Sequence, residues 1–208
     1  GVVGTTSLTK VGSGTWVLDG ANTYTGTTTI TNGTLRLQAS AANTSGGVTS
    51  VLGATNAITF GQNNNFAGGT LEFVGQDGVS SVQDLGLLTY NSVGANTIRV
   101  VPGAGATASL RFHNVNTGTG GSLNIVGADF TNNQVIFSHV NNGSPNGSGM
   151  VTRSVYWNGA DFAWRQNGVL RAPNYGVDGS TATTASAFTS AAHQRITGSF
   201  ATNSVSTL

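Results

Sequence analysis

Short stretches of alternating apolar and polar residues recur along the whole chain, with Gly, Asn and Asp between them. This pattern predicts strands of roughly four to seven residues joined by tight turns. The predicted strands are Thr15–Leu18, Thr27–Ile30, Thr34–Leu37, Ala57–Phe60, Thr70–Val74, Leu85–Tyr90, Thr97–Val101, Ser109–Phe112, Ser122–Val126, Val135–Ser138, Val151–Trp157 and Val169–Arg171. Only Thr181–Ala192 is a candidate helix, and its Thr and Ser content argues against one. The pattern indicates an all-β chain.

One phrase, Gly-hydroxyl-Leu-polar-apolar, occurs three times, at Gly33–Leu37, Gly69–Phe73 and Gly121–Ile125, with a near copy at Ala108–Phe112. In each copy the two apolar residues lie two positions apart and share one face of the strand. That face is expected to pack in the core and the other to contact water. Such self-similarity favours a solenoid with loops of unequal length. We therefore expect a right-handed parallel β-solenoid, with a β-sandwich or jelly roll as the alternative.

The composition narrows the class of protein. Among 208 residues, 38% are hydrophobic and only 7% charged, with a net charge of +1, so neither disorder nor a charged surface is indicated. No basic stripe is present that would bind nucleic acid. No apolar run approaches the roughly 20 residues that span a bilayer, so we expect no membrane insertion. The chain opens without a secretion signal, which we interpret as processing or excision.

The segment from Leu8 to Leu35 carries the most specific motif, reading LTKVGSGTWVLDGANTYTGTTTITNGTL. It resembles the autotransporter-associated β-strand repeat of bacterial passenger proteins, and this resemblance implies an exported, β-helical segment at the cell surface or outside the cell. Its glycines supply corners, while Asn22 and Asn32 are expected to bond turn amides or to form ladders. Leu8, Trp16, Leu18, Ile30 and Leu35 are the expected core, and Tyr24 is expected to pack in the core or a turn.

We interpret the chain as a single all-β module with four parts. The repeat motif occupies residues 8–35, degenerate β repeats occupy 36–149, an aromatic hairpin region occupies 150–175 and a Ser/Thr/Ala-rich strand segment occupies 176–208.

Enzymatic chemistry finds little support in the sequence. A polysaccharide hydrolase needs two carboxylates on one cleft, and the nearest candidates pair Asp77 with Glu72 or Asp84; solvated strand and turn positions explain all three better. His113, His139 and His193 lack metal-ligand spacing and Cys is absent, so zinc is not expected. Calcium turns of the Gly-Gly-x-Gly-x-Asp type are missing too. We expect no enzyme activity, cofactor or metal.

Aromatic residues gather near arginines between residues 150 and 175, where Asn158-Gly159 predicts a β-hairpin turn. Core or interface packing explains them best, but they are also candidates for contact with a glycan or partner protein. The candidate contact residues are Tyr156, Trp157, Trp164 and Arg165. Acceptor triplets for attached glycans begin at Asn32, Asn43, Asn142 and Asn146.

Neither end of the chain reads as a polar cap, which a soluble repeat array normally needs. We therefore expect copies or neighbouring repeats to join end to end into filaments by strand addition. The candidate joining residues are Val2, Val3, Phe200, Val205 and Leu208. Our leading hypothesis is a non-enzymatic, extracellular structural module of a bacterial surface or fibre protein. A carbohydrate-binding adhesin is the alternative, and a polysaccharide-degrading enzyme the third.

Overall fold

The computed structural model describes residues 4–61, 68–90, 94–117, 120–175, 177–179, 181–182 and 193–194. This part of the chain contains strands, turns and bends but no helix, which confirms the all-β prediction. The chain divides into two compact units, Gly1–Ala172 and Pro173–Leu208. No helix in the described part is long and apolar enough to cross a membrane.

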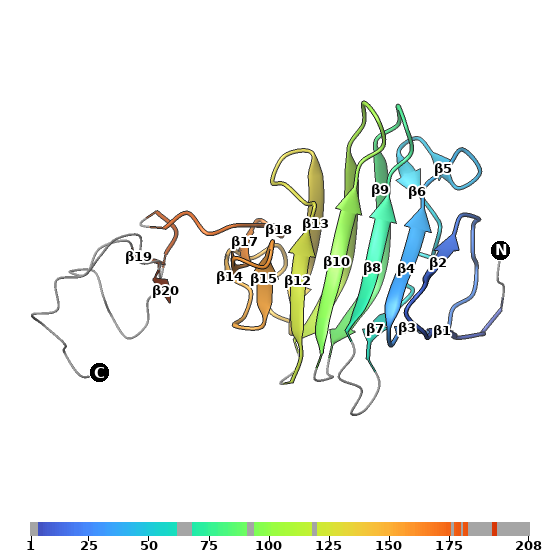
Figure 1. Ribbon diagram of the computed structural model, residues 1–208. Helices are drawn as coiled ribbons and strands as arrows, with labels where there is room; N and C mark the ends of the chain where they lie inside the picture. Colours follow the sequence, from blue (N-terminus) through green and yellow to red (C-terminus); the bar gives the residue numbers. More distant parts are fainter. Residues whose placement is uncertain are drawn as a thin grey trace, which may run out of the picture. The chain divides into compact units, whose positions relative to one another are not determined.

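Two sheets form the first unit (Figure 1). Sheet A contains β1 (Leu8–Lys10), β3 (Thr28–Ile30), β5 (Thr44–Ser45), β6 (Val48–Thr49), β7 (Ile58–Phe60), β9 (Ser81–Tyr90), β11 (Ala108–Thr117), β13 (Asn133–Val140), β14 (Gly149–Met150), β17 (Trp164–Gln166) and β18 (Val169–Arg171). Sheet B contains β2 (Thr15–Leu18), β4 (Gly33–Gln38), β8 (Gly69–Val74), β10 (Ala95–Val101), β12 (Ser122–Val126), β15 (Val155–Trp157) and β16 (Asp161–Phe162).

The chain alternates between the sheets, so each coil contributes one strand to sheet A, or in one coil the three strands β5, β6 and β7, and then one strand to sheet B. Every pairing between successive coils is parallel. A parallel pair needs a crossover rather than a hairpin, and here the other half of the coil supplies it. These pairings confirm the expected parallel β-solenoid over the jelly roll.

Coil length varies, as the unequal phrase spacings predict. Register partners are thirty residues apart from Thr28 to Ile58 and again from Ile58 to Leu88, then closer together from Leu88 to Val115 and from Val115 to Val140. The three Gly-led phrases fall in β4, β8 and β12 of sheet B, whereas the near copy without Gly falls in β11 of sheet A.

A corner interrupts the alternation of sheet A. In β9, Ser81, Gln83 and Leu85 are buried, two more exposed residues follow, and the pattern resumes with buried Leu88 and Tyr90. In β11 the same break falls at His113-Asn114, after buried Phe112 and before buried Val115. Two successive outward residues mark the corner at which each strand bends. The predicted strands Leu85–Tyr90 and Ser109–Phe112 each covered one side of it and are therefore shorter than β9 and β11.

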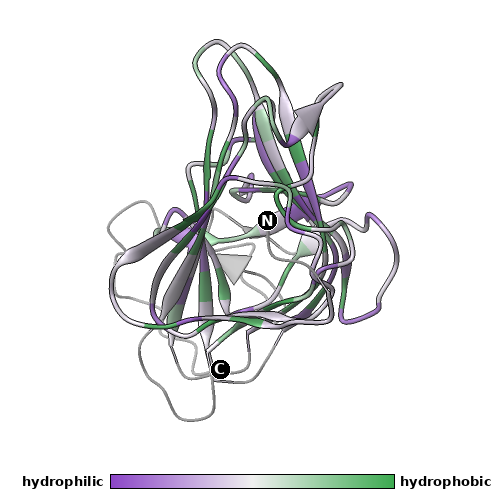
Figure 2. Ribbon diagram, turned by 90° about the vertical axis from the view of Figure 1, so that its right-hand side faces the viewer, coloured by the Kyte–Doolittle hydropathy of each residue, from purple (hydrophilic) through white to green (hydrophobic). Residues whose placement is uncertain are grey.

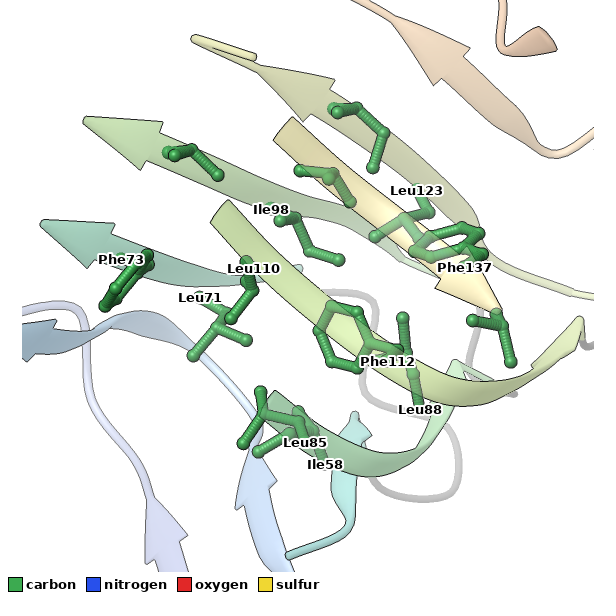
Figure 3. Close-up of a cluster of buried hydrophobic side chains, with 14 of the residues drawn as sticks. Ile58, Leu71, Phe73, Leu85, Leu88, Ile98, Leu110, Phe112, Leu123 and Phe137 are labelled. Atoms are coloured by element: carbon green, nitrogen blue, oxygen red, sulfur yellow. The ribbon is translucent and has the colours of Figure 1, made fainter. Parts of the chain in front are cut away.

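The core consists of ladders of in-register residues between the two sheets. Leu71, Ile98 and Leu123 from sheet B meet Leu110, Phe112 and Phe137 from sheet A (Figure 3). Green hydrophobic and purple hydrophilic segments alternate along the strands in Figure 2, as expected where one face is buried. One ladder has a tryptophan at each end; it runs Trp16, Leu35, Leu71, Ile98, Ile125 and Trp157.

Antiparallel strands follow the last coil. Strands β15 and β16 form the hairpin expected at Asn158-Gly159, whose two residues have positive φ angles of 51° and 66°. A second hairpin, β17–β18, turns at Asn167-Gly168, and β18 pairs with the outer edge of β13. The sheet A edge of the last coil is therefore paired with β18. The terminal segments that we interpreted as uncapped lie almost wholly outside the described residues.

The second unit is described only in part. Strands β19 (Thr181–Ala182) and β20 (His193–Gln194) form a parallel pair, and the Asn174 amide donates to the Asp178 carboxylate at 2.5 Å. The predicted joining residues Val2, Val3, Phe200, Val205 and Leu208 lie outside the described residues, as does most of the candidate helix Thr181–Ala192.

Candidate functional site

A buried lysine holds the first two coils together. Lys10 occupies the inward position of β1 that Ile30 takes in β3, and its side chain is fully buried. Its Nζ donates to the carbonyl oxygens of Val11 at 2.8 Å, Gly12 at 2.6 Å and Asn32 at 3.1 Å. An ammonium group has three N–H donors, so these bonds satisfy all of them without a carboxylate. Lys10 therefore ties the turn after β1 to the turn before β4.

The turn that receives this clamp requires glycine. Gly33 has a φ of +66°, and a Cβ there would overlap the carbonyl oxygens of Gly12 and Gly14. The Gly33 amide also donates to Asn32 Oδ1 at 2.6 Å. These contacts agree with the predicted corner role of Gly33 and with the expected bonding of Asn32 to a turn amide.

Polar side chains fill the neighbouring corner of the same coils. The Tyr24 hydroxyl is hydrogen-bonded to Thr28 Oγ1 at 2.6 Å, and Thr28 in turn donates to Asn56 Oδ1 at 2.8 Å. Asn22 Nδ2 donates to the Gly20 carbonyl and, between coils, to that of Val51. Burial raises the pKa of the Tyr24 phenol above its ordinary value, opposed by the hydrogen bond to Thr28. Tyr24 therefore packs inside the molecule, as expected.

The first coil leaves an open, apolar edge. Among the described residues, β1 and β2 pair on one side only, with β3 and β4. Trp16 shares the inward row of Leu35, but its exposed fraction is 43%, and Val11 and Val17 are also exposed. The prediction that Trp16 belongs to the core is thus wrong, because no coil covers the first one in the described structure. We call Val11, Trp16 and Val17 the open edge.

A charge ladder crosses the outer face of sheet B. Glu72 in β8 lies between its register partners Arg36 in β4 and Arg99 in β10. Its Oε2 is 2.5 Å from Arg36 Nε and its Oε1 is 3.6 Å from Arg99 Nη1. The two arginines cover Glu72, so it is buried, although it does lie on the outward face as predicted.

The other two carboxylates named as hydrolase candidates are also engaged. Asp84 Oδ1 is 2.8 Å from Arg111 Nε in the next coil. Asp77 accepts a hydrogen bond from the Ala104 amide at 2.7 Å. Each of the three carboxylates thus makes a local structural contact.

The four candidate contact residues of the aromatic region have different environments. Tyr156 stacks on Phe162 across the β15–β16 hairpin, with ring centroids 5.6 Å apart. Trp157, the next residue in the strand, packs against the core instead. Trp164 is buried, and the Arg171 guanidinium lies 5.9 Å from its ring centroid. Of the four, Tyr156 is the one whose ring stacks on the outer side of the hairpin.

Arg165 acts as a backbone clamp. Its Nη1 donates to the carbonyl oxygens of Phe137 at 3.2 Å and Ser138 at 3.4 Å, and its Nη2 donates to that of Ser144 at 3.5 Å. Partial burial lowers the pKa of its guanidinium from the ordinary value. Arg165 therefore connects β13, the last parallel strand of sheet A, to the loop that follows.

The glycan acceptor triplets also differ in environment. Asn43 is buried, and its Nδ2 donates to the carbonyls of Asp19 and Gln38, so a glycan on that nitrogen would break both bonds. Asn142 and Asn146 are exposed, and Asn32 is partly buried. Attachment at any of the four stays a prediction.

Two histidines that the sequence separates by 26 positions come together. The rings of His113 in β11 and His139 in β13 have centroids 5.0 Å apart with an interplanar angle of 46°. Their separation in sequence is close to one coil length at this point of the solenoid, and this coil length is the signal that could have revealed the pair. Groups of three or more His, Asp or Glu side chains suited to a metal ion do not occur in the described structure.

The Lys10 clamp, the Gly33 turn and Trp16 all fall inside one recognised stretch. Residues 8–37 match the family model of the passenger-associated-transport-repeat. The match confirms the suspected kinship with autotransporter-associated repeats for this stretch. The comparisons with curated proteins and with solved structures found no match.

The passenger-associated-transport-repeat thus corresponds to a defined structural unit. It runs from the start of β1 almost to the end of β4 and so contains two successive coils. Both sides of the Lys10 clamp lie inside it. The repeat therefore carries its own connection between coils.

Proposed function

We propose that this chain is a non-enzymatic structural module of a secreted or surface-exposed bacterial protein, and that further β-coils stack on its open edge. The observation that carries the proposal is the half-exposed Trp16 at the end of an inward row whose next four residues, Leu35, Leu71, Ile98 and Ile125, are buried. The passenger-type repeat at residues 8–37 supports both the structural role and a location outside the cell.

Stacking would stabilise this edge in two ways. A covering coil would remove Trp16 from water, and aromatic side chains bury about 150–250 Å² each. It would also pair the free backbone groups of β1 and β2, which otherwise offer a template to another strand. We propose that the covering strands come from a second copy of the chain, whose sheets end in β14 and β16 at the opposite edge, so that repeated head-to-tail contacts extend into a filament.

The engaged carboxylates support a structural role over a hydrolytic one. Glu72 and Asp84 are each paired with arginine, and Asp77 is bonded to a backbone amide. A hydrolase would instead hold two carboxylates toward a shared substrate cleft.

Sedimentation velocity of the full chain at rising concentration tests the stacking. Trp16→Glu places a carboxylate in the inward row, and burying that charge under another coil is costly. Val48→Glu is the matched control, because Val48 is 55% exposed and lies in β6, away from the open edge.

We expect the parent chain and Val48→Glu to associate with rising concentration, while Trp16→Glu stays monomeric with an unchanged circular dichroism spectrum. A parent chain that remains a single monomeric species up to the highest soluble concentration would overturn self-stacking. Equal association of both variants would show that the contact between copies does not involve the open edge.

A second candidate function, adhesion to glycans, rests on the Tyr156–Phe162 stack alone. Aromatic faces stack on sugar rings, so Tyr156→Ala is expected to abolish specific signals on a glycan array. The matched control is Tyr175→Ala, outside the solenoid unit. An array without specific signals for the parent chain contradicts adhesion.

A further inference from the structure

The outer corner of sheet A presents two imidazole rings side by side. His113 is exposed and His139 is partly exposed. Their ring centroids lie 5.0 Å apart, and the rings are tilted by 46° rather than stacked flat. The core does not use these side chains, because both belong to the outward positions at the corner.

One of the two rings has its tautomer set by the backbone. His139 Nδ1 lies 2.9 Å from the carbonyl oxygen of His113. A carbonyl can only accept a hydrogen bond, so Nδ1 must carry the proton. In a neutral ring this leaves Nε2 with a free lone pair. Histidines that bind metal ions characteristically donate their second ring nitrogen to a carbonyl or carboxylate in this way.

The spacing of the rings also fits a shared ion. With metal–nitrogen bonds of about 2.0–2.1 Å, and a ring nitrogen about 1.2 Å from its centroid, two imidazoles on one tetrahedral or square-planar ion hold their centroids roughly 4.5–5.2 Å apart. The observed 5.0 Å lies within this interval. The exposed His113 ring can rotate to direct a nitrogen toward the ion.

We propose that His113 and His139 form a two-histidine surface site for a late first-row divalent cation, Zn²⁺, Ni²⁺ or Cu²⁺. Water completes the coordination sphere. Imidazole nitrogen suits these ions, whereas Ca²⁺ and Mg²⁺ require oxygen ligands.

Two cationic side chains lie near the pair, and both are engaged in other contacts. The Arg111 guanidinium, two residues before His113, is paired with Asp84. Arg165 Nη1 donates to the carbonyl oxygens of Phe137 and Ser138, on the strand that carries His139. On the other side, Asn114 and Asn142 bond each other, with Asn114 Nδ2 donating to Asn142 Oδ1 at 2.5 Å. This link joins β11 to the loop after β13 beside His139, so the two strands bring the His113 and His139 side chains together before an ion binds.

Isothermal titration of the untagged 208-residue chain with Ni²⁺, Zn²⁺ and Ca²⁺ tests the site. His113→Asn and His139→Asn each remove one ring, and His193→Asn is the matched control because His193 lies in the second unit. We expect one equivalent of Ni²⁺ or Zn²⁺ to bind the parent chain and His193→Asn alike. Each of the other two variants should bind at least tenfold more weakly, and Ca²⁺ should not bind.

A second readout separates ligation from an indirect effect of the substitutions. In NMR spectra of the parent chain, Zn²⁺ should shift the ring resonances of His113 and His139 together and leave those of His193 in place. Absence of saturable Ni²⁺ and Zn²⁺ binding would overturn the proposal. So would binding that His193→Asn removes and His113→Asn leaves intact.

Discussion

Glu72 offers a quantitative test of the charge ladder. Glu72→Gln keeps the shape of the side chain but removes the anion between Arg36 and Arg99. A hydrogen bond to a charged group contributes about 1.5–3 kcal/mol. Glu72 has a side-chain exposure of only 7%, but Arg36 is 40% exposed, so solvent screening places the expected loss at about 1–2 kcal/mol.

The two arginines left behind add little to this loss. Their side chains are 40% and 55% exposed, so water and salt screen the repulsion between the two guanidinium groups. For a domain of this size, 1 kcal/mol corresponds to about 2–4 °C in Tm. Glu72→Gln should therefore lower the Tm by about 2–8 °C in a circular dichroism melt.

Asp84→Asn provides the matched control. Asp84 also pairs with an arginine on the next coil, but both side chains are well exposed, at 39% and 42%. An exposed pair contributes about 0–1 kcal/mol, so the shift should be at most a few degrees. The reasoning is refuted if Asp84→Asn lowers the Tm as much as Glu72→Gln, or if Glu72→Gln leaves it unchanged.

Two further predictions concern the first coils. Lys10→Met should destabilise the unit by about 1–2 kcal/mol in urea unfolding, because three carbonyls lose their donor while an unbranched side chain one atom shorter is kept. A gain in stability would contradict the clamp. Because the pKa of Tyr24 is raised in the folded state, the unfolded chain loses the phenol proton first as the pH rises. The free energy of unfolding should therefore be unaffected by Tyr24 below about pH 10 and should fall above it. Tyr24→Phe should weaken this alkaline fall, and an identical fall in both chains would contradict it.

The parallel solenoid could be predicted from the sequence because the Gly-led phrases repeat the same alternation of inward and outward residues. The phrases in β4 and β8 also pair with each other residue by residue. Gly33 and Gly69 are register partners, and so are Leu35 and Leu71. The alternation of apolar residues likewise placed Glu72 on the outward face. Local patterns of this kind survive in the sequence because the strands repeat them in every coil.

Features that depend on neighbouring coils could not be read from the same patterns. Alternation shows that Trp16 faces inward, but not that its coil is the outermost described one. The burial of Glu72 arises from arginines that precede and follow it by about one coil. His113 and His139 meet only because the coil from β11 to β13 is 25 residues long, whereas the coil before it, from β9 to β11, has 27.

The Lys10 clamp, the charge ladder and the open edge all depend on coils that stack in register. Because the chain contains no cysteine, introduced cysteine pairs can test this stacking directly. Thr29 and Thr59 are register partners on the outer face, and Thr89 is the next residue of the same ladder. Neighbouring strands lie about 4.8 Å apart, within disulfide range, whereas alternate strands lie beyond the limit of about 7 Å. The account predicts that Thr29→Cys/Thr59→Cys forms an intramolecular disulfide on mild oxidation and that Thr29→Cys/Thr89→Cys stays reduced. Ready formation of the second bond without the first would contradict it.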